Sequence, residues 1–203
     1  MHSNVSGRRV AAGLGVLTVV LALGACSSGG GHGGHNGGTS APNSPVQPSA
    51  VFNDADVTFA TGMIPHHGQA VRMAELAATR TTNEKLLALA TAIKGAQQPE
   101  IDKMTTWLRD WGKPVPDVDG GHGGHGAMPG MMSPEEMGKL TAAEGAAFDR
   151  LFLEMMIRHH EGAVTMSAEE QAKGANPEAK ALAAQITAAQ QAEIATMRGL
   201  LAG

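Results

Sequence analysis

Two pairs of adjacent histidines are the residues of this chain best suited to chemistry. The segment 63–67 reads MIPHH, and the segment 156–160 reads MIRHH. The pairs are His66 with His67 and His159 with His160. In each segment a methionine precedes the first histidine by three positions, so that a thioether and an imidazole would share one face of a helix. Helix packing alone does not require this arrangement twice, so its recurrence suggests metal binding.

The match between the two segments continues without a gap at the same offset of 93 residues. An Ala-Val step, a methionine and then a Gln-Gln-x-Glu-Ile-x-x-Met string all recur. A match of this length indicates an internal duplication. The matched polar and sulfur-containing residues are Met73 with Met166, Gln97 with Gln190, Glu100 with Glu193, and Met104 with Met197.

The donor atoms available favour copper. The chain has 9 His and 12 Met but only 1 Cys and no Tyr. Thioethers favour Cu(I) and imidazoles accept either oxidation state of copper, whereas thioether is a poor ligand for zinc. Core filling would explain about half of the methionines, and buried structural histidines remain the alternative for the pairs. From the spacing alone, the paired histidines and the methionines three positions before them, Met63 and Met156, are the candidate metal ligands.

A carboxylate and an amide lie within each of two otherwise apolar helical stripes. They are Gln97 and Glu100 in the first copy, and Gln190 and Glu193 in the second. Burying such a group without a partner costs roughly a few kcal/mol. The imidazoles or a bound ion are the available partners, so we predict that these four residues support and orient the metal ligands.

The sequence gives no sign of an enzyme. Di-iron enzymes built on four-helix bundles need Glu-x-x-His motifs, but Met or Ile stands three positions before each paired histidine. No nucleophile with an adjacent base and no phosphate-binding glycine loop stands out, so no organic cofactor is expected. A net charge of −4, with no basic run beyond Arg8-Arg9, argues against nucleic acid as a partner.

The N-terminus predicts export. Arg8-Arg9 precede an apolar run at 10–23, which at about 14 residues is shorter than a membrane span of roughly 20. The Leu-Gly-Ala-Cys string that follows resembles a bacterial lipobox. Residues 1–25 are therefore a predicted signal peptide, and Cys26 a predicted lipidation site that anchors the protein to the outer face of the cell membrane. A plain secretory signal with an incidental free cysteine is the alternative.

Two segments rich in Gly, Ser and Pro have little to bury and are predicted to be flexible. Residues 26–50 form a tether, and residues 112–134 link the two copies. Both contain the string Gly-His-Gly-Gly-His, which would capture metal weakly because the flexible chain must be ordered around the ion. Low-complexity drift is an open alternative. The residues predicted to capture metal weakly are His32, His35, His122, His125, Met128, Met131 and Met132.

Both copies have strong helical composition, and strand signals are nearly absent. We expect an all-α four-helix bundle, with hairpins at 51–111 and 135–203 that form one domain, 51–203. Asn53 or Asp54 should start the first helix, and Asn176, followed by proline, the last. Capping boxes at Thr81 and Thr141 should start the second and third helices.

Pro65 and Pro99 fall inside the helical patterns. Each removes a helical hydrogen bond, so we expect a local kink at both positions. A short turn of helix is also expected at the Ser-Pro-Glu-Glu string 133–136.

The MIPHH segment, followed by Ala-Val and Met and later by Gln-x-x-Glu-Ile-x-x-Met, resembles the CopM-like family of bacterial domains of unknown function. The resemblance covers 54–201, including both copies. It implies an exported, copper-binding, ferritin-like four-helix bundle, with some members associated with copper tolerance. The metal ligands that the resemblance implies are Met63, His66, His67, Met73, Met104, Met156, His159, His160, Met166 and Met197. Arg158 departs from the first copy, which has Pro65.

These observations lead to one main hypothesis and one alternative. The chain is predicted to be a membrane-anchored, extracytoplasmic copper-binding protein that buffers or carries copper without catalysis. The alternative is a structural or interaction lipoprotein of the cell envelope whose histidines are only packed polar residues. The protein partner is not predicted, and a homodimer is left open.

Overall fold

In a computed structural model, residues 51–119 and 128–203 are described, and they contain five α-helices and no strand. The predicted all-α class is confirmed. None of the described helices is both long and apolar enough to span a membrane. Cys26, His32, His35, His122 and His125 lie outside the described residues. The helices are α1 Asp54–Arg80, α2 Glu84–Asp110, α3 Pro134–Ala142, α4 Gly145–Lys173 and α5 Pro177–Ala202.

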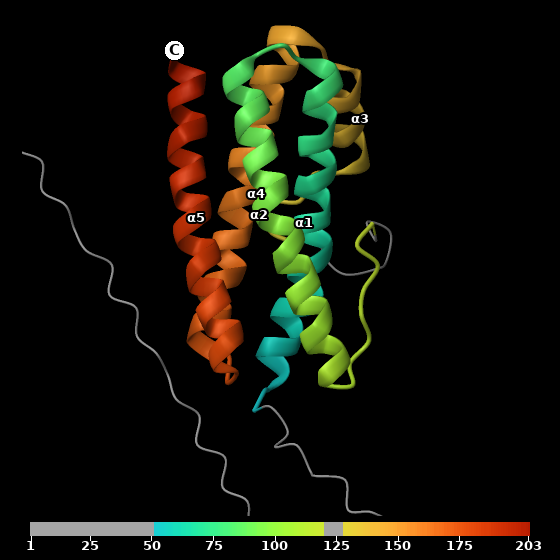
Figure 1. Cartoon of the computed structure of the whole chain (residues 1–203), viewed down its shortest axis with the longest axis vertical. Helices are drawn as coiled ribbons and strands as arrows, with labels where there is room; N and C mark the ends of the chain where they lie inside the picture. The colour runs from blue at the N-terminus through green and yellow to red at the C-terminus, as the bar shows by residue number, and fades with distance from the viewer. Residues whose placement is uncertain (1–50, 120–127) are drawn as a thin grey trace, which may run out of the picture. The chain divides into compact units, whose positions relative to one another are not determined.

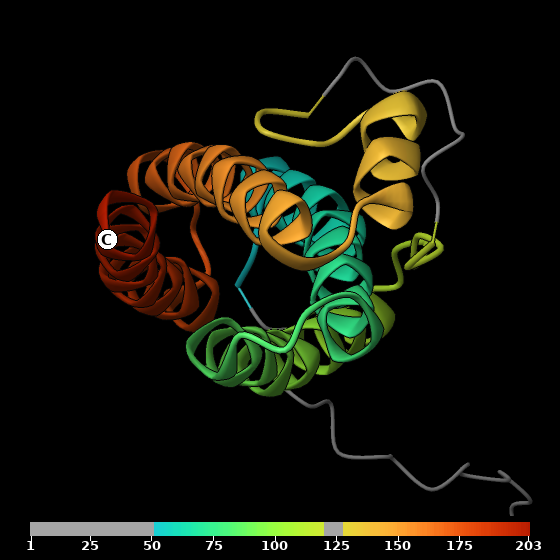
Figure 2. The same cartoon turned by 90° about the horizontal axis from the view of Figure 1, so that it is seen from above.

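The four long helices form two hairpins. α1 packs along α2, and α4 packs along α5, as Figure 1 shows. The two hairpins meet mainly through α1 and α4. Seen from above, the short helix α3 lies outside the four long helices, beside α1 and α4 (Figure 2). The result is a four-helix bundle with one additional short helix.

Two of the predicted helix starts are confirmed. The Asn53 side chain accepts hydrogen bonds from the backbone N–H groups of Ala55 and Asp56, and Asp56 completes a capping box at the start of α1. Asn176 caps α5 in the same manner, with Pro177 as the first helical residue. The short helix expected at 133–136 is longer than predicted, because α3 extends to Ala142.

The other two predicted starts are wrong. Thr81 is the residue that ends α1, and Asn83 caps α2 instead, because its side chain reaches the N–H groups of Lys85 and Leu86. Thr141 lies within α3 and does not start the third long helix. That helix, α4, begins at Gly145, whose φ of 56° is a left-handed conformation that favours glycine and separates α3 from α4.

Neither internal proline ends its helix. Pro65 lies inside α1 and Pro99 inside α2. Pro65 is buried and Pro99 is exposed. Each proline lacks an N–H group, so the carbonyl four residues earlier receives no helical hydrogen bond from it. The kinks expected there stay a prediction, although both helices continue through these positions.

The apolar core consists of two clusters, with a polar layer between them. Met63 of α1 and Ala163 of α4 belong to one cluster, whereas Met73 and Met156 belong to the other. α1 and α4 are therefore antiparallel. In α2, Ile93 belongs to the cluster of Met73 and Ile101 to the cluster of Met63. In α5, Ile194 belongs to the cluster of Met73 and Ile186 to the cluster of Met63. The paired histidines and the two glutamines lie between these positions along all four long helices, so the fold brings the duplicated polar residues to one level of the bundle.

Candidate metal centre

Four imidazoles fill the middle of the bundle. His66 and His67 come from α1, and His159 and His160 from α4. All four side chains are buried, with 0% exposure. We call these four residues the histidine layer. Full burial of four imidazoles in one region is unusual for a core, because each ring brings two polar nitrogen atoms that need partners.

The two inner rings lie against each other. The centroids of His66 and His159 are 3.8 Å apart, and the ring planes are tilted by 39°. Burial, followed by the nearby His67, lowers the pKa of His66 to about 3. Burial, followed by His66 itself, lowers the pKa of His159 well below its ordinary value. Both rings are thus neutral near pH 7, which is the form that binds a metal.

The two outer rings have matching carboxylate partners. His67 Nε2 donates to Glu100 Oε2 at 2.7 Å, and His160 Nε2 donates to Glu193 Oε2 at 2.6 Å. The imidazole partner expected for each glutamate is therefore present. In both rings Nδ1 is buried and has no hydrogen-bond partner. A histidine that ligates a metal usually donates its other N–H to a carboxylate or carbonyl in this way.

The inner rings differ in their hydrogen bonds. His66 Nε2 donates to the backbone carbonyl of Pro129 at 3.0 Å, and its Nδ1 has no partner. Neither ring nitrogen of His159 has a hydrogen-bond partner. An unpaired buried polar atom costs about 1–3 kcal/mol. The layer therefore retains unpaired nitrogen atoms that a bound ion would satisfy.

The predicted methionine ligands lie on both sides of the histidine layer. One group belongs to the cluster around Met63, and the other to the cluster around Met156. The first group contains two methionines of the first repeat and one of the second, and the second group contains one of the first repeat and two of the second. The first group is Met63 and Met104, with Met166 packed against them, and the second is Met73, Met156 and Met197. All of them are completely buried except Met166, which is partly exposed.

The two amides predicted to support the site lie at the level of the histidine layer but have few partners. Gln97 and Gln190 are buried. Neither amide atom of Gln97 makes a hydrogen bond, and Oε1 of Gln190 also lacks one. These groups add unsatisfied donors and acceptors to the four imidazoles. Their support of metal ligands stays a prediction.

The His, Cys, Asp and Glu side chains do not by themselves form a metal site in the described part of the chain. No group of three or more His, Cys, Asp or Glu side chains is placed there to hold a metal ion. An ion in the histidine layer would need ligands of another kind to complete its coordination. Methionine thioethers lie in the clusters on either side of the layer, and a mixed set of imidazole and thioether donors suits copper better than zinc or iron.

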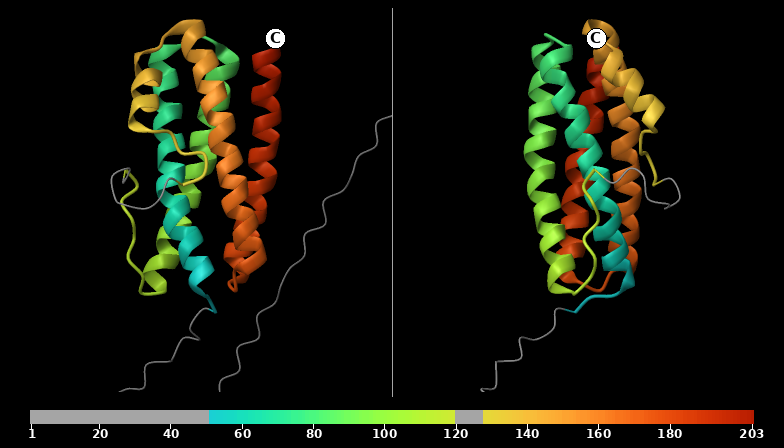
Figure 3. Two further views of the ribbon diagram at one scale, coloured as in Figure 1. Left: turned by 180° about the vertical axis from the view of Figure 1, so that it is seen from behind. Right: turned by 90° about the vertical axis from the view of Figure 1, so that its right-hand side faces the viewer.

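One part of the linker differs from the prediction. Residues 112–134 were expected to be a flexible tether, but residues 128–133, which we call the strap, lie against α1 and α4 (Figure 3). Met132 is only 4% exposed, and its Sδ accepts a hydrogen bond from Arg158 Nη2 at 2.8 Å. Met128 and Met131 are partly exposed. The hydrogen bond from His66 is accepted by the backbone carbonyl of Pro129, so the side-chain type at 129 gave no indication of this contact.

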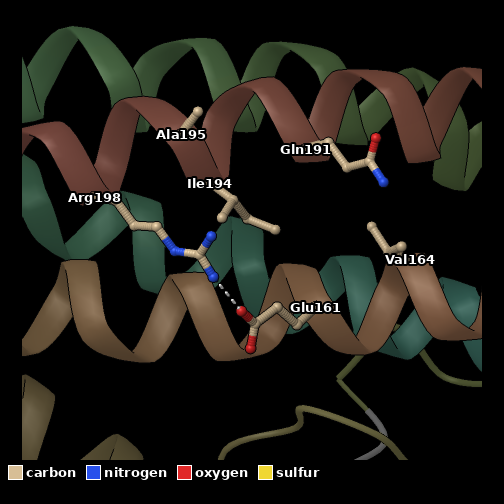
Figure 4. Close-up of a pocket in the computed structure, with 6 residues that line it drawn as sticks. All are labelled: Glu161, Val164, Gln191, Ile194, Ala195 and Arg198. Carbon is tan, nitrogen blue, oxygen red and sulfur yellow. Dashed lines mark hydrogen bonds and ion pairs between the residues drawn. The ribbon is translucent and has the colours of Figure 1, made fainter.

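Two hollows on the described surface are lined by none of the four histidines, although Met166 lines the second. One, of about 320 Å³, lies between α4 and α5 and is lined by Val164, Gln191, Ile194 and Ala195, with the Glu161–Arg198 ion pair at its edge (Figure 4). It contains no histidine or methionine. The candidate centre is a buried layer and not an open pocket.

Comparison with solved structures gives relatives of known fold. A DUF305 protein from Streptomyces coelicolor is 34% identical, with a TM-score of 0.66, over 73% of this chain and 92% of that one. A DUF305 fragment from Deinococcus radiodurans is 33% identical, also with a TM-score of 0.66, over 76% of this chain and 99% of that one. No curated protein matches the chain.

A third relative was solved with metal. CopM in its Cu(II)-bound form is 37% identical, with a TM-score of 0.63, over 72% of this chain and 95% of that one. CopM was also solved with Cu(I) and with silver. The family model for a domain of unknown function, DUF305, matches residues 56–201, which include both repeats and the histidine layer. The chain belongs to the DUF305 family.

Proposed function

We propose that this protein is an exported copper-binding protein that buffers or carries copper through the histidine layer and the flanking methionines. Metal tolerance is the role that this activity would serve. Copper is the cargo of the protein and takes part in no reaction there. The ligands are the four imidazoles together with the six methionines of the two groups.

One observation carries the proposal. In His66, His67 and His160, Nε2 donates to an oxygen atom, while the buried Nδ1 has no partner. In each of these rings Nε2 is held by an oxygen atom and Nδ1 is left without a partner, which is the arrangement of histidines that ligate metals. A purely structural histidine would be expected to use both of its nitrogen atoms when it is fully buried.

The relatives support the choice of metal. CopM binds Cu(I), Cu(II) and silver. Silver and Cu(I) are both soft ions that prefer thioether and imidazole donors. The ligand types in the layer and in the methionine groups fit such ions.

The location in the cell is part of the proposal. We infer that Cys26 carries lipid and that residues 26–50 connect this anchor to the helical bundle. The relative from Streptomyces coelicolor is named as a presumed secreted protein. Mass spectrometry of the mature protein should show acyl chains on Cys26 and the absence of residues 1–25. An intact N-terminus, or a free Cys26 thiol, would contradict the anchor without affecting copper binding.

Metal titration of the purified protein tests the main proposal. Cu(I) should be titrated against a competing chelator, with Cu(II), Zn(II) and Fe(II) in parallel. We expect tight, saturable Cu(I) binding and weak binding of Zn(II) and Fe(II). Failure to bind any of these ions would favour the alternative of a structural lipoprotein.

Two matched variants locate the binding. The first replaces the histidine layer, His66, His67, His159 and His160, with glutamine. The second replaces the four tether histidines His32, His35, His122 and His125 with glutamine, so that it loses the same number of imidazoles. The first should lose tight Cu(I) binding while its circular dichroism stays helical, and the second should lose only weak binding. If instead the second variant lost tight Cu(I) binding and the first kept it, the tight site would lie in the tethers.

A further inference from the structure

The strap covers one edge of the histidine layer and is held there by side chains of both repeats. Gln69 of α1 accepts a hydrogen bond from Met132 N at 2.7 Å and donates to Met132 O at 2.8 Å. Arg158 of α4 donates to Met132 Sδ and to Glu136 at the start of α3. The carbonyl of Pro129 accepts from His66. The strap is thus attached to α1, to α4 and to the layer itself.

Glycines allow the strap to approach this closely. Gly130 has a φ of 78° and lies against the backbone of His159 and Gly162. A methyl group at Gly162 would overlap the carbonyl oxygen of Pro129, a backbone atom that cannot move alone. The close contact therefore depends on the absence of a side chain at Gly162 of α4.

The two repeats differ where the strap passes. The position of Gln69 in the first repeat corresponds to Gly162 in the second, and that of Pro65 corresponds to Arg158. Gln69 holds the strap, Gly162 makes room for it, and Arg158 binds Met132. Three of the four residues at these unlike positions, Gln69, Gly162 and Arg158, thus contact the strap.

Two thioethers lie together beside the strap. A Cβ added at Gly62 of α1 would lie 3.0 Å from Met166 Cε and 3.6 Å from Met128 Sδ. Met128 belongs to the strap and Met166 to α4, and both are partly exposed. Met166 also packs against the cluster that contains Met63. A soft ion arriving from solvent would therefore meet these two sulfur atoms before the fully buried donors.

We propose that the strap is the gate of the histidine layer, and that Met128 and Met166 form an outer thioether site from which Cu(I) enters. This inference rests on the proposed function and adds the route by which the ion reaches its site. With the strap closed, the four imidazoles have no exposed surface. In this proposal, release of residues 128–133 opens the route to the layer, and the frequency of release sets the rate of uptake and loss.

Two variants open the gate without changing a ligand. Gly162→Ala displaces Pro129 by overlap, and Gln69→Ala removes both hydrogen bonds to Met132. Gly95→Ala is the control, because a methyl at Gly95 of α2 meets nothing within 4 Å. Met128→Leu removes one outer thioether, with Met137→Leu in α3 as its control.

Two measurements on the full chain in mild detergent read out the gate. Hydrogen exchange of the Met132 amide reports strap release without any metal. Transfer of Cu(I) from a coloured chelator reports uptake. We expect both opening variants to accelerate Met132 exchange and to raise the transfer rate roughly tenfold relative to Gly95→Ala. Met128→Leu should slow transfer severalfold relative to Met137→Leu.

The outcomes separate the two proposals. Faster Met132 exchange with an unchanged transfer rate would overturn the gate while leaving copper binding intact. Unchanged exchange in both opening variants would show that Gln69 and Gly162 do not control the strap, and would also overturn it. A parent protein that takes up no Cu(I) would refute the proposed function, and the gate with it. Equal Cu(I) transfer rates for Met128→Leu and Met137→Leu would refute the outer thioether site.

Discussion

The two repeats agree at the outer histidines and differ at the inner ones. The contacts of His67 with Glu100 and of His160 with Glu193 measure 2.7 and 2.6 Å, at equivalent positions of the repeat. His66, by contrast, donates to the strap, whereas His159 has no hydrogen bond. The linker that forms the strap occurs once, between the repeats. The two repeats therefore have the same contact where both the histidine and its glutamate partner are duplicated. They differ at the inner histidines, because the partner of His66 lies in a linker that occurs once.

The largest expected effect tests the symmetric part. His67→Leu and His160→Leu each leave a partly buried glutamate without its donor, and each should lower the free energy of unfolding by about 2 kcal/mol. Urea unfolding of the metal-free protein measures this. As a control, Arg198→Met removes an exposed ion pair with Glu161 and should cost less than about 1 kcal/mol. A clear difference in the free energy of unfolding between His67→Leu and His160→Leu would show that the outer histidines of the two repeats are not equivalent.

The next effect tests the asymmetric part. His66→Leu leaves the Pro129 carbonyl without its donor and should cost about 1–2 kcal/mol. His159→Leu removes two unpaired buried nitrogen atoms and should leave the metal-free protein equally stable or more stable. Both variants should bind Cu(I) more weakly than the parent. Equal destabilisation of the metal-free protein by the two substitutions would contradict the assigned difference between the inner rings.

A third comparison concerns an acidic pair at one end of the bundle. Asp56 accepts hydrogen bonds from the backbone N–H groups of Ala175 and Asn176, and the nearby Glu170 is buried. The equivalent of Asp56 in the second repeat is Asp149, which accepts from the side chain of Asn83. The equivalent of Glu170 in the first repeat is Ala77. Only one of the two aspartates therefore has a second carboxyl group beside it.

This difference predicts a pH dependence. Burial, followed by the neighbouring Asp56, raises the pKa of Glu170 to about 8, against a small opposing effect of Lys180. The stability that depends on neutral Glu170 is fully present below its ordinary pKa of 4.5 and is lost as pH rises through about 8. Thermal unfolding should therefore show that Glu170→Gln gains about 1 kcal/mol over the parent at alkaline pH and little near pH 5. Glu169→Gln, at an exposed neighbour, should show no such gain.

The smallest effect makes one hairpin more like the other. Gly95 in α2 corresponds to Ala188 in α5 and has open space around its Cα. Gly95→Ala should raise the free energy of unfolding by about 0.5–1 kcal/mol through helix propensity alone. Chemical denaturation measures the gain, and Cu(I) affinity should not change. A loss of stability would show that the two hairpins differ in packing at this position.

The periodicity of the sequence predicts the helices and the duplicated polar residues because both depend on local pattern. Asn53 and Asn176 were found as helix caps from their position before helical segments. Thr81 and Thr141 were wrongly assigned because a capping-box spacing does not show where the preceding helix ends. The contact of Pro129 with His66 could not be predicted, since it is made by a backbone carbonyl and joins positions far apart in the chain.

Each methionine group draws on both repeats, with Met166 beside Met63 and Met104 on one side of the layer. A single hairpin therefore could not provide either group by itself, and the helical bundle has the internal organisation of a dimer whose two subunits have been joined. In a dimer of identical subunits every substitution appears twice. Joining the subunits removes that restriction, so one half can hold a covering segment with glutamine while the other makes room for it with glycine.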